Sequence, residues 1–409
     1  WTVLHALGAP DVILDLFKKG WEGHLRQYTE EKTVDVPFAR DGMYFREFPV
    51  MFDWMHHGEG YSAFDLQCLS DPYDTTLIDR MCRYAALYMG EDRLANNYDK
   101  ENRLIRSMFN GSRGSMLRKA TGLDWAGDPI DIEGRFDPGH GERNFQEMLD
   151  HFKDYNDVAG DHPLNMGATT FGLNAYMLTG ETMYRDWVLE YLDAWVERTE
   201  SNGGLIPTNV GLDGTPGGEC DGRWWGGVYG WGFTVVVPQT GELAHRPAFQ
   251  GRYPYGLGNA LLLTGDQKYV DLIRRVNEIV NSNCKEEQGQ IVYPHMYGDE
   301  GWYDFKPQRF NSGDLEVYFW SMNDDDAELI AGTSQYGKDQ YGENDWISYL
   351  KGDNPLFPVQ ALERDIEIVR KTTEDIRQDR STPDTRMSDD MNSTNPCIRA
   401  VTGTLTNLM

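Results

Sequence analysis

The candidate acid–base side chains lie in a few short segments rich in glycine and aromatic residues. One segment places His56 and His57 shortly before Tyr61, and another places His295 two residues before Tyr297. A histidine can take up a proton near neutral pH, and a tyrosine hydroxyl can donate one. We therefore predict His57 or His295 as a catalytic base and Tyr297 as a candidate catalytic acid.

The segment Gly222–Trp231, GRWWGGVYGW, is the strongest local signal. Its glycines disfavour a regular helix or a central strand, so its aromatic rings are predicted to lie in a loop. Flat rings in such a loop suit stacking on sugars, and Tyr229 is a second candidate acid. The planar guanidinium of Arg223 can bind a carboxylate through two hydrogen bonds. Packing in the protein core is the alternative explanation for the same aromatic residues.

Asn165 has two interpretations, as an N-terminal helix cap or, together with Arg223, as a residue that neutralises a substrate carboxylate. We predict that further substrate contacts come from His56, Tyr61, Trp224, Trp225, Trp231, Arg252, Tyr253, Trp302 and Tyr303. Asp299 and Glu300 form an alternative acid–base pair, and other candidate carboxylates are Glu59, Asp161, Glu219 and Asp221.

His56, His57 and Glu59 also have side chains that bind Zn or Mn, and the aspartates at 324–326 and 389–390 could bind Ca through oxygen atoms. However, the chain lacks both the HExxH spacing of zinc enzymes and the spacing of an EF-hand. Adjacent histidines often point apart, and runs of aspartate are commonly solvated. The sequence therefore requires no cofactor, and a divalent metal (Zn, Mn or Ca) is the alternative.

The chain carries 38 Lys and Arg against 66 Asp and Glu, a formal net charge of −28. This balance argues against a nucleic-acid partner, because phosphate binding needs clustered positive charge. No apolar run approaches the roughly 18 residues of a membrane-spanning helix, so membrane insertion is not expected. The five cysteines are scattered and include no Cys-x-x-Cys pair, which disfavours a structural zinc site and a disulfide framework.

An acidic surface suits a salty or extracellular setting, so we expect a periplasmic or extracellular protein. The chain starts at Trp1 rather than Met, and we expect that any export signal was lost with the true start. It stops at Met409 within a small-residue stretch that reads as a helix, so we expect a further part, such as a β-domain, to follow. The sequence leaves the oligomeric state open.

Two stretches repeat one pattern, and this repeat predicts the elements that position the candidate residues. Gly172–Val196 and Leu257–Val280 align on Leu-Thr-Gly, which places Asn174 on Asn259. Each copy predicts a helix, a short Thr-Gly-acid break and a second helix with apolar residues three or four positions apart. A divergent third hairpin is predicted at 61–89. Because a helix hairpin cannot bury its apolar face alone, the repeat indicates stacked neighbours.

In a stack of helix hairpins, the breaks lie on one face, and the segments that enter and leave each hairpin lie on the opposite face. The breaks carry ordinary turn residues. The polar and aromatic segments all fall on the opposite face, at 53–61, 160–169, 222–231, 252–255 and 293–303. Their convergence predicts a binding or active site there.

We predict one catalytic domain over 1–409. It comprises an N-terminal helix and extended lead-in at 1–52, helix hairpins at 53–380, and a loop with the start of a further helix at 381–409. Apolar spacing predicts individual helices at 11–28, 144–155 and 355–378.

Stacked helix hairpins with a mouth lined by His, Tyr, Asn and Arg resemble the α/α-toroid carbohydrate-active enzymes. These include polysaccharide lyases that act on uronate-containing glycans and several glycoside hydrolase families. The resemblance covers roughly residues 50–380 and rests on hairpin period and site composition. It implies a mainly α fold, an incomplete or complete (α/α)n toroid with long irregular loops on one face, and an oligo- or polysaccharide substrate.

Two mechanisms fit that class. A polysaccharide lyase cleaves by β-elimination, in which Asn165 and Arg223 would neutralise the uronate carboxylate, His57 or His295 would be the base, and Tyr229 or Tyr297 the acid. A glycoside hydrolase would use two carboxyl groups instead, such as Asp299 and Glu300. The density of His and Tyr favours the lyase. A non-catalytic glycan-binding solenoid is the third hypothesis, which the long loops disfavour because they suit a closed pocket.

Overall fold

The computed structural model describes residues 5–6, 8–30, 44–45, 48–49, 67–115, 117, 159–218, 220–226, 230–232, 234–236, 243–245, 253–326, 348–349 and 351–378. This part of the chain is mainly α, as the sequence predicts. The predicted helix at 144–155, the candidate segment 53–61 and the predicted C-terminal region 381–409 lie outside the described residues.

The described helices are α2 (Asp11–Glu30), α4 (Thr75–Tyr88), α6 (Thr169–Thr179), α7 (Thr182–Ser201), α8 (Tyr253–Thr264), α9 (Lys268–Ser282), α10 (Asp314–Ser321) and α13 (Phe357–Gln378), with the 3-10 helix η2 (Pro163–Ala168) before α6. The strands pair antiparallel: β1 (Tyr44–Phe45) with β2 (Phe48–Pro49), β3 (Tyr98–Asp99) with β4 (Leu104–Ile105), β5 (Thr234–Val236) with β6 (Leu243–His245), and β8 (Gln290–Gly298) with both β7 (Lys285–Glu287) and β9 (Gly301–Lys306).

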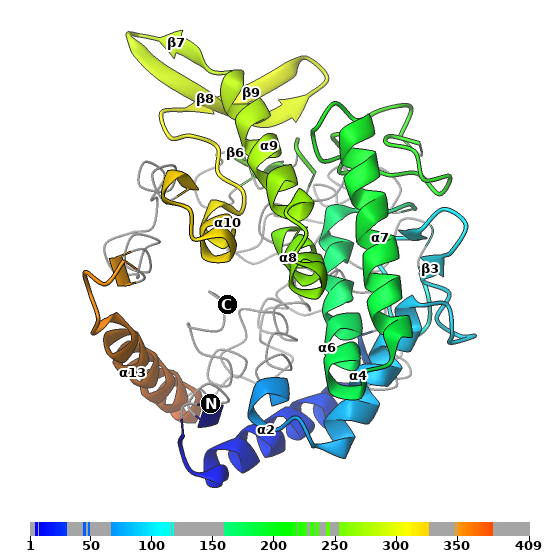
Figure 1. Ribbon diagram of the computed structural model, residues 1–409, viewed down its shortest axis with the longest axis vertical. Helices are drawn as coiled ribbons and strands as arrows, with labels where there is room; N and C mark the ends of the chain where they lie inside the picture. The colour runs from blue at the N-terminus through cyan, green and yellow to red at the C-terminus, as the bar shows by residue number, and fades with distance from the viewer. Residues whose placement is uncertain are drawn as a thin grey trace.

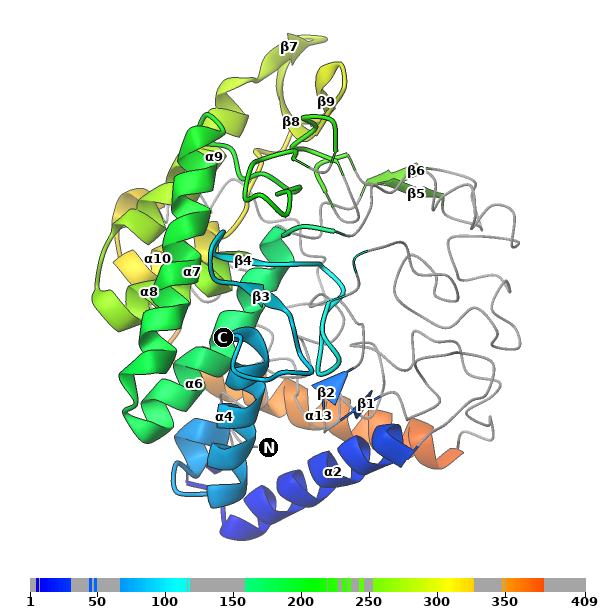
Figure 2. The ribbon, with the colours of Figure 1, turned by 90° about the vertical axis from the view of Figure 1, so that its right-hand side faces the viewer.

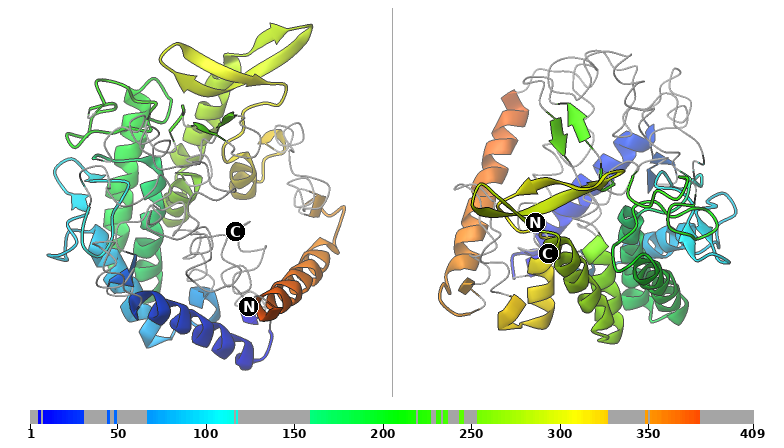
Figure 3. Two further views of the ribbon diagram at one scale, coloured as in Figure 1. Left: turned by 180° about the vertical axis from the view of Figure 1, so that it is seen from behind. Right: turned by 90° about the horizontal axis from the view of Figure 1, so that it is seen from above.

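The helices stack in chain order. α4 packs on α6, α6 on α7, α7 on α8, α8 on α9 and α9 on α10. In Figure 1 the described helices follow an arc from α2 at the bottom, through α6 and α7 at the right, to α10. Helix α13 lies at the lower left of the same view. The β7–β9 sheet projects beyond the end of α9 (Figure 3). The predicted stack of helix hairpins is therefore present.

The two breaks that align in the sequence are also the same in their hydrogen bonds. The Thr179 hydroxyl donates to the carbonyl oxygen four residues earlier at 2.7 Å and accepts from the Glu181 N–H at 3.1 Å. Thr264 repeats the first bond at 2.7 Å and the second, from the Asp266 N–H, at 3.1 Å. A short Thr-Gly-acid sequence therefore specifies one local structure twice.

A glycine lies at the same point of each break. Gly180 has a φ of 74° and Gly265 a φ of 71°, in the left-handed region where a side chain is disfavoured. Glycine ends a helix in this conformation without a steric penalty. The helix reversal in each hairpin is thus encoded locally.

Aligned asparagines connect each hairpin to the one before it. Asn259 of α8 donates to the Thr169 hydroxyl of α6 at 2.9 Å. Asn174 of α6 lies with its Nδ2 4.0 Å from the sulfur of Met81 in α4. The sequence repeat therefore carries contacts between hairpins as well as within them.

A further break, not predicted from the sequence, follows α10. The Ser321 hydroxyl accepts from the Asn323 N–H at 3.1 Å, as the threonines do, and Met322 occupies the glycine position with a φ of 51°. Ser-Met-Asn replaces Thr-Gly-acid, which hid the repeat. Asp324–Asp326, interpreted above as solvated charges or calcium ligands, begin the helix after this break.

The residue five positions after the threonine or serine of a break contacts the preceding hairpin in two of the repeats. The Tyr269 hydroxyl donates to Asp193 of α7 at 2.7 Å. At the corresponding place, the largely buried Asp326 pairs with Arg274 of α9 at 2.7 Å. Each second helix is therefore linked to the second helix of the preceding hairpin.

Two glycines set the closest helix contacts. A Cβ on Gly172 would lie 2.7 Å from Val188 of α7, and one on Gly258 would lie 2.4 Å from the Trp320 ring of α10. Such distances leave no room for a side chain, so these positions explain why helices rich in large aromatic residues can still pack closely.

The bounds of α2 and α13 agree with the predicted helices, but their buried faces agree only in part. The apolar spacing in the sequence predicts a buried stripe that includes Phe17 and Trp21 on α2 and Val359 and Ile366 on α13. Phe17 and Trp21 are buried, whereas Val359 and Ile366 are exposed. α13 buries Phe357 and Ala361 instead. The buried pair is one helical turn apart and defines a different face from the predicted stripe. Among the described helices, none is both long and apolar enough to cross a membrane.

Candidate functional site

The segment 293–303 is part of the β8–β9 hairpin. Tyr293, His295 and Tyr297 alternate with buried residues such as Met296, so the three share one face of the sheet. The strand register places Tyr297 opposite Trp302. The alternating pattern therefore turns three of the polar and aromatic side chains toward the same side.

The loop that carries the Gly-Trp sequence is anchored to the chain just after α7. The carbonyl oxygen of Trp224 accepts from the N–H groups of Thr208 and Asn209 at 2.7 and 3.2 Å. The Trp231 indole donates to the carbonyl oxygen of Ile206 at 3.0 Å. These bonds hold the loop in place without regular secondary structure, which its glycines disfavour.

Ring contacts join this loop to the β8–β9 hairpin. Trp224 stacks on Tyr297 with centroids 4.9 Å apart, and Tyr297 meets Trp302 edge to face, also at 4.9 Å. Trp302 contacts Trp231, which in turn stacks on Phe310. We call this group the aromatic cluster; its members are Trp224, Trp225, Trp231, His295, Tyr297, Trp302 and Phe310.

The aromatic cluster lies on the face that the hairpin argument predicts. The loop follows α7 and the β-hairpin follows α9, so both leave the second helix of a helix hairpin. In Figure 2 they lie together at the top, away from the ends of α6 and α8 that carry the breaks. The prediction that 222–231 and 293–303 converge is confirmed for the described residues.

One hydrogen bond of His295 identifies which ring nitrogen carries a proton. Its Nε2 lies 3.0 Å from the carbonyl oxygen of Gln308. A carbonyl oxygen can only accept, so Nε2 carries a proton, and in the neutral ring the lone pair is on Nδ1. No described residue forms a hydrogen bond with Nδ1. Burial lowers the pKa of His295, the Gln308 bond partly opposes this, and the nearby Lys306 adds to the lowering.

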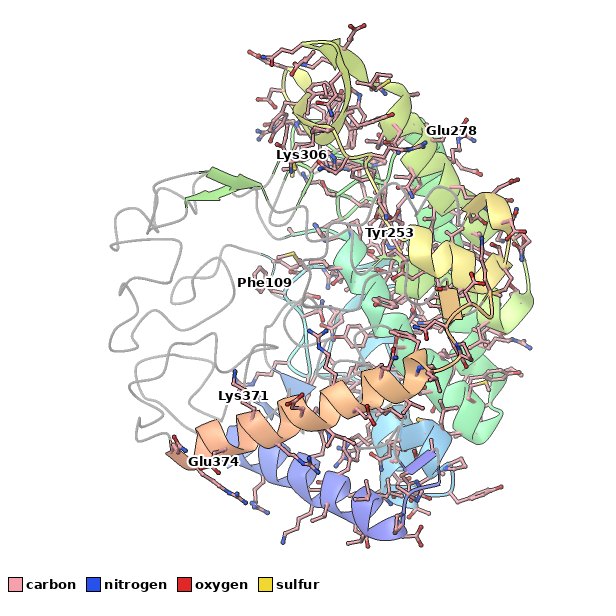
Figure 4. The ribbon with its side chains drawn as sticks, turned by 90° about the vertical axis from the view of Figure 1, so that its left-hand side faces the viewer. Phe109, Tyr253, Glu278, Lys306, Lys371 and Glu374 are labelled. Carbon is pink, nitrogen blue, oxygen red and sulfur yellow. The ribbon has the colours of Figure 1, made fainter. Side chains whose placement is uncertain are left out.

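Two cations beside Tyr293 were not among the residues predicted from the sequence. Lys306 pairs with Tyr293 across the strands, and the Arg309 guanidinium lies 5.9 Å from the centre of the Tyr293 ring. Figure 4 labels Lys306 at the end of β9 nearest the helices. Lys306 also forms an ion pair with Asp304 at 2.8 Å, whereas Arg309 pairs with no carboxylate among the described residues. The period-two alternation of 290–306 was the sequence signal for this arrangement.

The predicted carboxylate pair lies at the exposed tip of the β-hairpin. Asp299 and Glu300 form the turn between Gly298 and Gly301. The Trp225 indole donates to Asp299 at 3.3 Å. Asp299 thus holds one edge of the aromatic cluster.

Asn165 does not lie with these residues. It is completely buried in η2, where its oxygen accepts from Asn110 at 3.0 Å and its nitrogen donates to Ser107 and Asp161 at 3.1 and 2.8 Å. With both ends of the amide occupied, no group remains to neutralise a substrate carboxylate. The role predicted for Asn165 in catalysis is therefore corrected to a structural one. Asp161 is buried in the same way.

The other predicted residues fall into three groups. Trp231 and Tyr253 are fully buried and cannot contact a substrate, which corrects the prediction for both. Arg223 is exposed beside Trp224, and Tyr303 pairs with Met296, so it faces the side of the sheet opposite His295. His56, His57, Tyr61, Tyr229 and Arg252 lie outside the described residues.

The described residues include no cluster of three His, Cys, Asp or Glu side chains arranged to bind a metal ion. The metal site considered at His56, His57 and Glu59 lies outside those residues.

One comparison with known proteins gives a match. The model of the family described as "Domain of unknown function (DUF8034)" matches residues 1–291 and 281–402. No curated protein and no solved structure gives a significant match.

Proposed function

The chain belongs to the DUF8034 family, and we propose that this member is a carbohydrate-active enzyme that binds a glycan against the aromatic cluster. The observation that carries the proposal is the stacking of Trp224 on Tyr297, which brings aromatic rings, a neutral histidine and two cations onto one surface. The stacked helix hairpins agree with the α/α-toroid resemblance, and closure into a toroid is part of this proposal.

Sugar binding is supported by the partial exposure of the rings at the edge of the cluster. Trp224, Trp225 and Tyr297 are half-buried, while Trp231 beneath them is fully buried. Rings that are held from behind and open in front lose little conformational entropy when a sugar stacks on them. The exposed Arg223 adds a hydrogen-bond donor beside them.

The reaction that these side chains support best is β-elimination on a uronate-containing glycan. His295 would remove the proton on the carbon next to the carboxylate, and the electron pair left there would form a carbon–carbon double bond. The glycosidic carbon–oxygen bond would break, and the leaving oxygen would take a proton from Tyr297. The two residues lie on the same face of β8, about 7 Å apart along the strand, so they suit the two sides of one glycosidic linkage.

A base can remove that proton only if the charge on the neighbouring carboxylate is offset. Asn165 cannot do this, but Lys306 and Arg309 lie two residues along the strand from His295, beside Tyr293. Arg309 has no competing carboxylate partner among the described residues. We therefore assign carboxylate binding to Arg309, with Lys306 as a second cation.

Hydrolysis by Asp299 and Glu300 has less support. A general acid needs burial or a neighbouring charge to hold its proton near neutral pH. Both side chains are exposed at the tip of the β-hairpin, and the Asp299 carboxylate already accepts a hydrogen bond from the Trp225 indole.

Incubation with a panel of uronate-containing and neutral polysaccharides tests the proposal. A lyase would raise the ultraviolet absorbance through the new double bond, on the uronate glycans alone. New reducing ends without this absorbance would identify a hydrolase. If neither product forms but a glycan binds measurably, the protein is a glycan-binding protein. Absence of both products and of binding across the panel would contradict the proposal.

Matched variants separate the assigned roles. His295→Gln and Tyr297→Phe should each abolish the absorbance change. Lys285→Ala is the control for Arg309→Ala, because Lys285 is a cation of the same sheet that lies over Phe305, on the opposite side from Tyr293. Only the Arg309 variant should lose activity on uronate glycans.

A further inference from the structure

Asp161 is the centre of a buried polar network. Its Oδ1 accepts from the Asn165 amide at 2.8 Å, from the Tyr191 hydroxyl of α7 at 3.1 Å and from the His162 N–H at 2.8 Å. Its Oδ2 accepts from the Ile105 N–H of β4 at 3.0 Å. The side chain is almost fully buried, so it cannot contact a substrate. It instead fixes its own backbone relative to three separate parts of the fold.

That backbone pairs with the segment leading to the aromatic cluster. The Asp161 N–H donates to the Val210 carbonyl oxygen at 2.7 Å, and the Val210 N–H donates back at 3.1 Å. Gly160 makes the close approach feasible, because a Cβ there would lie 2.1 Å from the same carbonyl oxygen. A glycine with a φ of 100° is therefore required beside the carboxylate.

The segment bound by Asp161 also binds the Trp224 backbone. Thr208 and Asn209, directly before Val210, donate their N–H groups to the carbonyl oxygen of Trp224. The Asn209 side chain donates in addition to the carbonyl oxygen of Arg223 at 3.0 Å. One short stretch of chain thus connects the buried carboxylate to the loop at the candidate site.

We propose that Asp161 is a positioning residue for the candidate site, holding the loop of Trp224 and Trp225 in place through Val210. The reason is mechanical: the loop has little regular structure and takes its position from residues 206–210. These residues are held by the backbone of Asp161, which the four hydrogen bonds to its carboxylate fix. The loop is held in this way whatever ligand the site takes.

Hydrogen exchange and fluorine NMR on the full chain test the proposal. In Asp161→Ala, amide exchange in 206–210 and 222–226 should accelerate about tenfold or more, the factor implied by losing one hydrogen bond to a charged group. With fluorotryptophan incorporated, the resonances of Trp224 and Trp225, assigned from Trp→Phe variants, should shift or broaden. Asp161→Asn keeps an acceptor for three of the four donors and should restore most of the protection.

Asn97→Ala is the matched control. Asn97 is equally buried, and its amide donates to the carbonyl oxygens of Leu87 and Gly111 at 3.0 and 2.8 Å, away from the loop. This variant should leave exchange in 206–226 and both fluorine resonances unchanged. If the Asp161 variants leave them unchanged too, or if the Asn97 variant changes them equally, the proposal is overturned. If Asp161→Ala does not fold, Asp161→Asn is compared with Asn97→Ala instead. Asp161→Asn should then accelerate amide exchange in 206–210 and 222–226 by a smaller factor, and Asn97→Ala should not accelerate it there.

Discussion

Trp224 and Tyr297 stack with ring centroids 4.9 Å apart and planes inclined by 28°. Trp224 belongs to the loop after α7, and Tyr297 belongs to the β-hairpin after α9. Their contact therefore joins the segments that follow two successive helix hairpins. The candidate site therefore exists only when the hairpins are stacked.

Removal of the Trp224 ring should weaken glycan binding more than it destabilises the fold. An aromatic pair contributes about 0.5–1.5 kcal/mol beyond area burial, and a bound sugar would lose its stacking surface as well. We expect Trp224→Ala to reduce the affinity for a uronate oligosaccharide about tenfold or more, measured by calorimetry. Tyr73→Ala removes a highly exposed ring from the turn before α4 and should leave the affinity unchanged. Equal affinities of the two variants would argue against binding at the aromatic cluster.

The pH dependence of turnover should report His295. Burial lowers its pKa below 6.5, against the opposing bond from Gln308. A base is active when neutral, so kcat/KM should fall only as pH drops through a value below 6.5. The measurement is a pH profile of kcat/KM on the best uronate substrate. An acidic limb at or above 6.5, or full activity of His295→Gln, would remove this residue from the chemistry.

Gly160→Ala should be strongly destabilising. The added Cβ would meet the Val210 carbonyl oxygen at 2.1 Å in a left-handed backbone conformation. We expect the free energy of unfolding to fall by about 3 kcal/mol or more. Gly180→Ala is the control, because its φ of 74° is also left-handed but its surroundings are open; it should cost about 1 kcal/mol. Urea denaturation measures both, and equal losses would show that the contact with Val210 is relieved cheaply.

Asp161 should make stability depend on pH. Burial raises its pKa from 3.8 to about 6, and the charge of Arg198 partly opposes this. Tyr98 of β3 and Tyr191 of α7 are the other titratable groups that face it. The folded protein keeps a proton over this range that the unfolded chain has released, so stability falls as pH rises from about 4 to about 6.

Comparison with Asp161→Asn isolates that contribution. Relative to this variant, the wild-type free energy of unfolding should decline by up to about 3 kcal/mol across the window. Urea unfolding curves at several pH values measure the difference. A constant difference between the two proteins would mean that the carboxyl titrates alike in the folded and unfolded states.

The sequence alone was enough to predict the helix hairpins and the convergence of 222–231 with 293–303. The reason is that the breaks are local: Thr179 and Thr264 make the same hydrogen bonds to neighbours within four residues, and a glycine ends each helix. Because the breaks of stacked hairpins lie on one face, the segments that leave the second helices lie together on the opposite face. At the break after α10, the Ser321 hydroxyl accepts from the Asn323 N–H as the threonines do, but it donates to Asp326 instead of to a carbonyl oxygen four residues earlier. This break was missed because Met322 occupies the glycine position.

Only the tertiary structure decided which polar residues reach the surface. Asn165 and His295 are both polar residues in segments of similar composition. Asn165 is buried with both amide atoms bonded, whereas Nδ1 of His295, within the aromatic cluster, forms no hydrogen bond with a described residue. Arg309 likewise gains its place from the return of β9 beside β8. Local sequence specifies backbone turns through hydrogen bonds a few residues long. Burial depends on partners brought from distant parts of the chain, and no local pattern encodes them.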